Sequence, residues 1–225
     1  MTEYTLIRSE RKTAAICIKD GGVQVRAPLK MPLRDIDSFV KAKEKWIEGR
    51  LKKSREQAEE RAAFALNYGS AVLYRGKEYP ITAKNGDRIG FDGLKFYMPP
   101  GLPPAGIKAA CVSIYRMLAQ KYLTAVTMDM ANRMGVTPTA IKVSGAAKRW
   151  GSCSARKNIN FSWRLVMADD EVIAYVAVHE LAHLREMNHS AKFWNIVAGV
   201  TPGCGECKER LKELQKRLAK EDWSL

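Results

Sequence analysis

Hydrophobic and polar residues alternate in short runs over much of the first 103 residues, a pattern typical of strands in a small sheet. Gly, Asn and Asp residues between the runs indicate turns. Between the second and third runs, apolar residues recur every three or four positions and predict a helix from Leu33 to Phe64. The expected strands are 14–18, 23–27, 71–74, 79–83 and 94–98, with Asp20-Gly21-Gly22 as the turn between the first two.

The pattern becomes mainly helical after the proline-rich segment 99–104. The predicted helices are 107–134, ending at Gly135, then 169–187, a stretch from Ser190, and 206–220. The predicted strands are 141–143 and 159–166, on either side of a loop that contains residues 149–154. We therefore expect an α+β chain in two parts: an N-terminal β-rich region with a long helix over 1–103, and a second region over 104–225.

Composition narrows the functional classes. The chain has 225 residues, of which 46% are hydrophobic, and this excludes a wholly disordered protein. The net charge of +14 is divided evenly, with +7 in residues 1–103 and +7 in residues 104–225, so no basic arm for nucleic acid stands out, although an anionic substrate stays open. No apolar run is long enough to span a membrane, and the polar start lacks the pattern of a signal peptide, so we expect a cytoplasmic protein without a membrane partner.

All three histidines lie within eleven residues, at His179, His183 and His189. Residues four apart on a helix share one face, so His179 and His183 can converge on one metal ion, and a turn near residues 187–188 would bring His189 back to it. Three neutral imidazoles leave Zn²⁺ one open position for a water molecule. Glu180, next to the first ligand, can then take a proton from the metal-activated water as general base.

Four segments carry a resemblance to a known family: 149–154 (Arg-Trp-Gly-Ser-Cys-Ser), 159–165, 175–184, and 188–190 with 193–194. On these segments the chain resembles the YgjP-like branch of the SprT-related zinc metallopeptidases. The resemblance covers nearly the whole chain, so it implies a single family-wide unit as the alternative to two separate regions. The resemblance implies a zincin-like core with the active-site helix beside a small sheet, one zinc ion held by His179, His183 and His189, and Glu180 as general base. It also implies that the strand over 158–167 lies along the cleft, where it can pair with an extended peptide. Lys157 departs from the family pattern, which usually has glycine at this position.

Three functions follow from these features. The first is a metallopeptidase that cleaves peptide bonds with Glu180 as general base, other divalent transition metals being open as alternatives to zinc. The second is a metal-dependent phosphohydrolase of nucleoside triphosphates, which the positive charge favours. The third, a DNA-associated protease, would need a separate nucleic-acid module that the sequence does not reveal. The number of subunits is not indicated by any feature of the sequence.

Two further groups of side chains have alternative roles. Arg149 either stabilises an oxyanion in the transition state, or holds a carboxylate or phosphate of the substrate, or pairs with a structural carboxylate. Cys204 and Cys207 have the spacing of half a structural zinc site, but the sequence offers no second pair to complete it.

Overall fold

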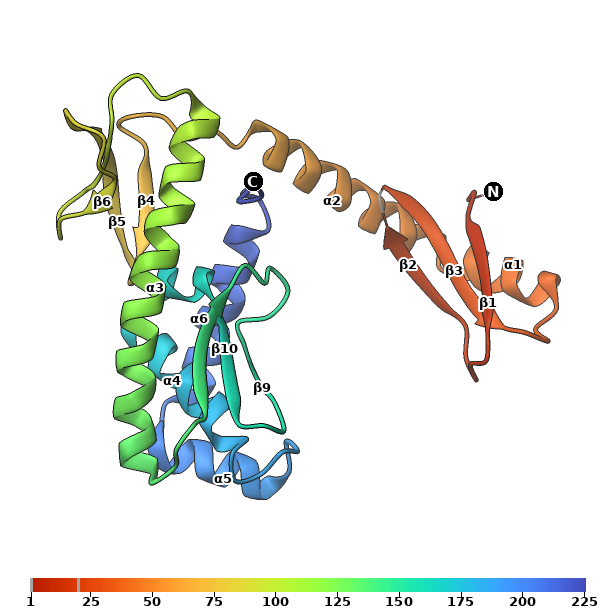
Figure 1. The fold of residues 1–225 in the computed structure, drawn as a ribbon. Helices are drawn as coiled ribbons and strands as arrows, with labels where there is room; N and C mark the ends of the chain where they lie inside the picture. Colours follow the sequence, from red (N-terminus) through yellow and green to blue (C-terminus); the bar gives the residue numbers. More distant parts are fainter. Residues whose placement is uncertain (1, 20) are drawn as a thin grey trace. The chain divides into compact units, whose positions relative to one another are not determined.

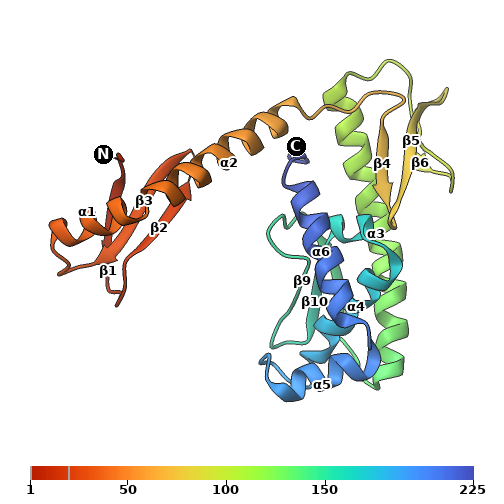
Figure 2. The ribbon, with the colours of Figure 1, turned by 180° about the vertical axis from the view of Figure 1, so that it is seen from behind.

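The computed structural model describes residues 2–19 and 21–225, which form a mixed α+β chain (Figures 1 and 2). Internal contacts divide the chain into two compact units: one contains the residues up to Phe64 with Ala219–Asp222, and the other contains Ala65–Leu218 with Trp223–Leu225. The expected division at 103/104 therefore lies inside the second unit. Among the described residues no helix is both long enough and apolar enough to cross a membrane.

The N-terminal unit is a three-stranded sheet in the order β1-β3-β2, packed against two helices. The central strand β3 (Gly22–Pro28) pairs parallel with β1 (Thr5–Ser9) and antiparallel with β2 (Ala15–Lys19). Alternate β3 side chains enter a core with residues from α1 (Leu33–Ala42) and α2 (Glu44–Ala63). The buried core residues are Val23, Val25, Ala27, Ile36, Val40 and Ile47.

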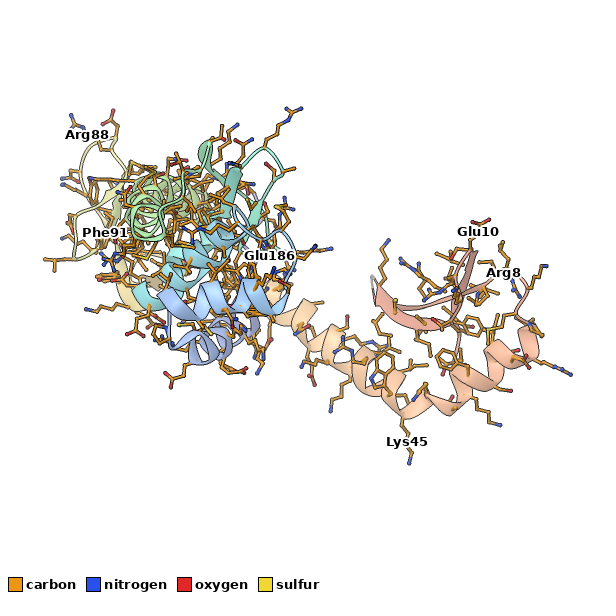
Figure 3. The ribbon with its side chains drawn as sticks, turned by 90° about the horizontal axis from the view of Figure 1, so that it is seen from below. Arg8, Glu10, Lys45, Arg88, Phe91 and Glu186 are labelled. Carbon is orange, nitrogen blue, oxygen red and sulfur yellow. The ribbon has the colours of Figure 1, made fainter. Side chains whose placement is uncertain are left out.

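The prediction of one continuous helix over 33–64 is wrong, because the helical backbone is interrupted at Lys43, where φ is −107°. The break lets both helices turn apolar residues toward the same sheet, while charged residues such as Lys45 point away from it into solvent (Figure 3). Of the turn predicted between the first two strands, Asp20 lies outside the described residues; Gly21 has a positive φ of 75°, as such a turn requires.

The larger unit is built along one long helix, α3 (Pro104–Met134), which ends as predicted at Gly135 in the left-handed conformation. Two small sheets lie at different levels along this helix (Figure 1). The first has the order β4-β5-β7-β6 and consists of Ala71–Tyr74, Lys77–Ala83, Phe96–Met98 and Gly90–Phe91. The second has the order β8-β10-β9 and consists of Ala140–Ser144, Asn158–Ser162 and Gly151–Cys153.

After β10 the chain forms a 3₁₀ helix, η1 (Trp163–Met167), and then α4 (Asp170–Ala182), α5 (Ala191–Val200) and α6 (Cys204–Leu218). The strand predicted for 159–166 therefore ends four residues early. The side chains of η1 explain the misleading sequence signal: Trp163, Leu165, Val166 and Met167 are all buried, so the stretch is apolar without being extended.

The proline-rich segment 99–104 leads into a helix and lies within the second compact unit. Pro103 is the N-cap of α3 and Pro104 is its first residue, a position where proline is favoured because the backbone N–H has no helical partner. The small sheet before this segment is attached to α3 by a hydrogen bond. Tyr115 of α3 donates its hydroxyl to the carbonyl of Leu73 at 2.6 Å, which ties β4 to the long helix.

The turn between β4 and β5 rests on the start of α4. The backbone N–H of Arg75 donates to the carbonyl of Val166 at 2.7 Å. The guanidinium of Arg75 donates two hydrogen bonds to the carboxylate of Asp170. Gly76 lies so close to Asp169 that an added Cβ would be 2.9 Å from the Asp169 Cβ. Asp169 is the N-cap of α4 and accepts a hydrogen bond from the backbone N–H of Val172. The turn therefore helps to fix where α4 begins.

We expect Gly76→Ala to destabilise the larger unit more than Gly101→Ala does. Both glycines have a positive φ, +74° and +79°, so alanine costs about 1–2 kcal/mol of backbone strain at either position. Only at Gly76 does the new Cβ also meet Asp169, and such overpacking adds about 1–3 kcal/mol. Urea denaturation of the two variants measures the difference. Equal losses of stability would show that the turn does not press on the N-cap.

Candidate metal centre

The helix α4, which carries His179 and Glu180, is buried on almost every side. Nine of its 13 residues are buried, because apolar side chains occupy most of its positions. The helix ends at Ala182, five residues before the predicted end. His183 keeps helical backbone angles as the C-cap, and the chain then tightens, because the N–H groups of Leu184 and Arg185 bond to carbonyls only three residues back. This turn sends the chain back toward α4.

The three histidines converge after this turn. Nitrogen atoms of His179, His183 and His189 all lie within 4.8 Å of one another, and no other set of three or more His, Cys, Asp or Glu side chains in the described sequence converges in this way. The Nε2 atoms of His179 and His189 are 3.1 Å apart. Two ligands of a tetrahedral ion with bonds of about 2.0–2.1 Å are separated by about 3.3 Å, so the observed spacing fits a shared metal ion.

The protonation of the imidazoles also suits a metal. Burial lowers the pKa of His179 to about 4, with smaller effects from the two other histidines, and burial also lowers the pKa of His183. Both rings are therefore neutral at neutral pH and have a free lone pair. The Nδ1 atom of His183 lies 3.2 Å from the backbone carbonyl of Glu186, in the loop after α4 (Figure 3). If Nδ1 donates to this carbonyl, Nε2 is the nitrogen left for a metal.

One aromatic side chain supports all three imidazoles. Phe193 of α5 is fully buried, and its ring centroid lies 4.9, 4.6 and 4.7 Å from those of His179, His183 and His189. Ser190 is the N-cap of this helix and accepts a hydrogen bond from the backbone N–H of Phe193, so the helix begins where the sequence predicts. The contact of Phe193 with every candidate ligand could not be foreseen from the sequence, since it depends on how α5 packs against α4.

Glu180 lies beside this cluster and is only 6% exposed. Burial raises the pKa of its carboxyl to about 7, and the positive charge of Arg149 opposes part of the increase. The carboxylate makes no hydrogen bond with any residue in the described part of the chain, and its oxygen atoms are not fully buried. Its oxygens therefore reach solvent, as those of a group that exchanges protons with water must do.

The wall beside Glu180 is β9, a strand that the sequence pattern did not predict. β10 is the central strand, parallel to β8 and antiparallel to β9, so the expectation that 158–167 offers a free edge to a peptide is wrong. The free edge next to α4 belongs to β9. The N–H of Ser154 bonds to Asn158 and the N–H of Ser162 bonds to Trp150, and this register turns the backbone groups of Gly151 and Cys153 away from β10.

The β9–β10 hairpin contains the residue that departs from the family pattern. Lys157 has a positive φ of 59°, and its N–H donates to the carbonyl of Ser154 at 2.8 Å. The position thus requires the left-handed conformation in which glycine is favoured, and lysine adopts it at a cost of about 1–2 kcal/mol. The hairpin closes despite the substitution.

The remaining sequence candidates lie outside the convergent cluster. Arg149 is exposed and forms no ion pair with a described residue, which disfavours pairing with a structural carboxylate. Burial raises the pKa of the Cys153 thiol, and the nearby charge of Glu180 adds to this. Cys204 and Cys207 are free thiols, and within the described sequence they do not belong to any group of three metal donors.

The raised pKa of Glu180 predicts a pH-dependent difference in stability between the metal-free protein and its Glu180→Gln variant. The carboxyl ionises near 4.5 when unfolded and near 7 when folded, so the folded state binds the extra proton between these values and the parent loses stability as the pH rises through them. Glutamine does not ionise. We therefore expect the variant to be more stable than the parent at pH 8, by about 3 kcal/mol at most, with the advantage vanishing near pH 4. Urea denaturation with a chelator present measures both; a constant difference across the range would contradict the shift.

Comparisons with known proteins identify the family of the chain. The family model described as YgjP-like, metallopeptidase domain, matches residues 12–214. No curated protein matches the chain. Among solved structures, the metallopeptidase zymogen of Pyrococcus abyssi abylysin aligns with a TM-score of 0.38 and 21% identity over 44% of this chain and 97% of its own. The metallopeptidase zymogen of Methanocaldococcus jannaschii jannalysin gives 0.37 and 22%, over 42% and 96%. Since the family match covers most of the sequence, the chain belongs to the YgjP-like metallopeptidase domain family and is a metallopeptidase-like hydrolase.

Proposed function

We propose that the protein is a zinc-dependent peptidase in which His179, His183 and His189 hold one zinc ion and Glu180 is the general base. The observation that supports this most directly is the convergence of the three imidazoles within 4.8 Å, with the buried Glu180 next to the first of them. When bound, a divalent transition metal supplies Lewis-acid chemistry, polarising a carbonyl group and making a water molecule more acidic. All the remaining tasks fall to side chains and backbone of the protein.

Glu180 moves the protons. A carboxyl with a pKa of about 7 accepts a proton from the attacking water and can return it to the leaving amine, because its two protonation states are close in free energy at neutral pH. Its burial against β9 keeps it beside the imidazoles. Arg149 is the candidate for the negative charge that develops on the carbonyl oxygen, since it is exposed and its charge already acts on Glu180.

The free edge of β9 is the proposed binding surface for an extended peptide. The outward backbone groups of Gly151 and Cys153 supply donors and acceptors for one more strand, and Gly151 lies against Glu180. A peptide paired there would pass beside the general base. Main-chain pairing of this kind recognises extended backbone, a property of polypeptides that nucleotides do not share.

Substitution of a proposed ligand is expected to remove the metal. We expect the parent to bind about one zinc ion per chain and His183→Ala to bind it at least about a hundredfold more weakly, because losing a ligand costs more than losing one of its outer hydrogen-bond partners. Metal analysis after dialysis measures the content, with Lys192→Ala, an exposed position on α5, as the control. Parental zinc content in His183→Ala would refute the assignment.

Substitution of the proposed base is expected to stop turnover while the metal stays. Glu180→Gln should cleave an unstructured polypeptide about 10²–10⁴-fold more slowly, the usual contribution of a general base, with unchanged zinc content. Glu206→Gln makes the same chemical change at an exposed site on α6 and should retain parental activity.

The same preparations should be incubated with a panel of nucleoside triphosphates. We expect no hydrolysis of these. Cleavage of triphosphates alone, lost in Glu180→Gln, would replace the peptidase with a phosphohydrolase that uses the same residues.

A further inference from the structure

Gly151 is the residue of β9 that lies against the Glu180 side chain. A Cβ built on its backbone would be 2.5 Å from Oε1 of Glu180, 2.7 Å from its Cγ and 2.8 Å from its Cδ. All three distances are shorter than real Cβ contacts, so any side chain at this position would occupy space that the Glu180 side chain now fills. The conflict involves the reacting carboxyl itself and not a neighbouring group.

The need for glycine here is a need for space and not for an unusual backbone. Gly151 does not have a positive φ, and it lies opposite Phe161 in a regular antiparallel register. Two residues along, Cys153 faces the same side of the sheet, opposite Ile159, and carries a side chain. The strand therefore accommodates a side chain at Cys153, whereas the position that lies against Glu180, Gly151, has no side chain.

We propose that Gly151 is a positioning residue for Glu180: its missing side chain lets the carboxyl lie flat against β9, between the strand edge and the imidazole cluster. The inference rests on the proposed role of Glu180 as general base. Glu180 has no hydrogen bond to a described residue that would hold it, so its place is set by packing, and Gly151 forms one wall of that packing.

An alanine at this position would force one of two movements. Either the Glu180 side chain rotates away from β9, or β9 moves away from α4. The first movement displaces the carboxyl from the water that it must deprotonate, and the second removes the wall that holds the carboxyl in place. The three atoms nearest to the new methyl group all belong to Glu180 and none to an imidazole. The expected signature is a fall in kcat with little change in KM and with the metal retained, because a displacement of about 1 Å can cost a hundredfold in rate.

The first test compares Gly151→Ala with Gly199→Ala. Gly199 lies in α5 of the same unit, and a Cβ added there meets no atom within 4 Å, so it controls for the loss of a glycine as such. With an unstructured polypeptide as substrate and zinc-loaded protein, we expect Gly151→Ala to lose about a hundredfold in kcat, to keep KM within about threefold and to bind one zinc ion. Parental kcat in Gly151→Ala would overturn the proposal.

The second test is a double-mutant cycle with Glu180→Ala, which removes the atoms that the new methyl group would meet. If Gly151 acts through Glu180, Gly151→Ala lowers the unfolding midpoint of the parent by about 3 °C or more but leaves that of Glu180→Ala unchanged. It likewise causes no further loss of the residual activity of Glu180→Ala. An equal drop in midpoint in both backgrounds would overturn the proposal in favour of a general structural role for Gly151.

The cycle also separates this proposal from the proposed function. A parent that cleaves no polypeptide would refute the peptidase assignment, yet the unfolding midpoints are compared without substrate and still decide whether Gly151 and Glu180 are coupled. If Gly151→Ala is too unstable to purify, recovery of the folded double variant at the level of Glu180→Ala supports the coupling, and failure of both to fold refutes it.

Discussion

Burial of α4 is the physical constraint on which the candidate site depends. A carboxyl and two imidazoles are carried on or directly after a helix that is shielded from solvent on most sides, and the low local dielectric favours their neutral forms. The same cause thus raises the pKa of Glu180 and lowers that of His179. The neutral imidazoles can bind a metal, and the carboxyl is close to its midpoint at neutral pH. The packing that produces burial also limits the space, which is why a glycine faces Glu180.

The candidate site could be predicted well from the sequence where its geometry is local. The spacing of His179 and His183 places both on one helical face whatever the rest of the chain does, and a buried α4 follows from its apolar residues. The convergence of His189 needed only a turn of a few residues. By contrast, the contacts of Phe193 and Gly151 depend on how α5 and β9 pack on α4, and no local pattern records such distances.

The errors in the predicted fold share a cause of the same kind. A three-residue strand such as β9 is too short to show alternation, and its place at the sheet edge follows from β10 pairing on both sides. The apolar residues of η1 resemble a strand because burial, and not extension, selects them. Proline residues before α3 indicate a break in structure equally well for a helix start and for a domain boundary. Only the contacts of the small β4–β7 sheet with α3 and α4 separate these two interpretations.

The composition of the chain finally limits which side chain can move protons. All three histidines belong to the convergent cluster, so none is left to act as a separate acid or base. Burial raises the pKa of Tyr175, one turn before His179, to about 12, and burial raises the pKa of the Cys153 thiol as well. Both therefore keep their protons at neutral pH. Burial raises the pKa of the Glu180 carboxyl to about 7, near neutrality, and this supports the proposal that one carboxyl both removes and returns the proton.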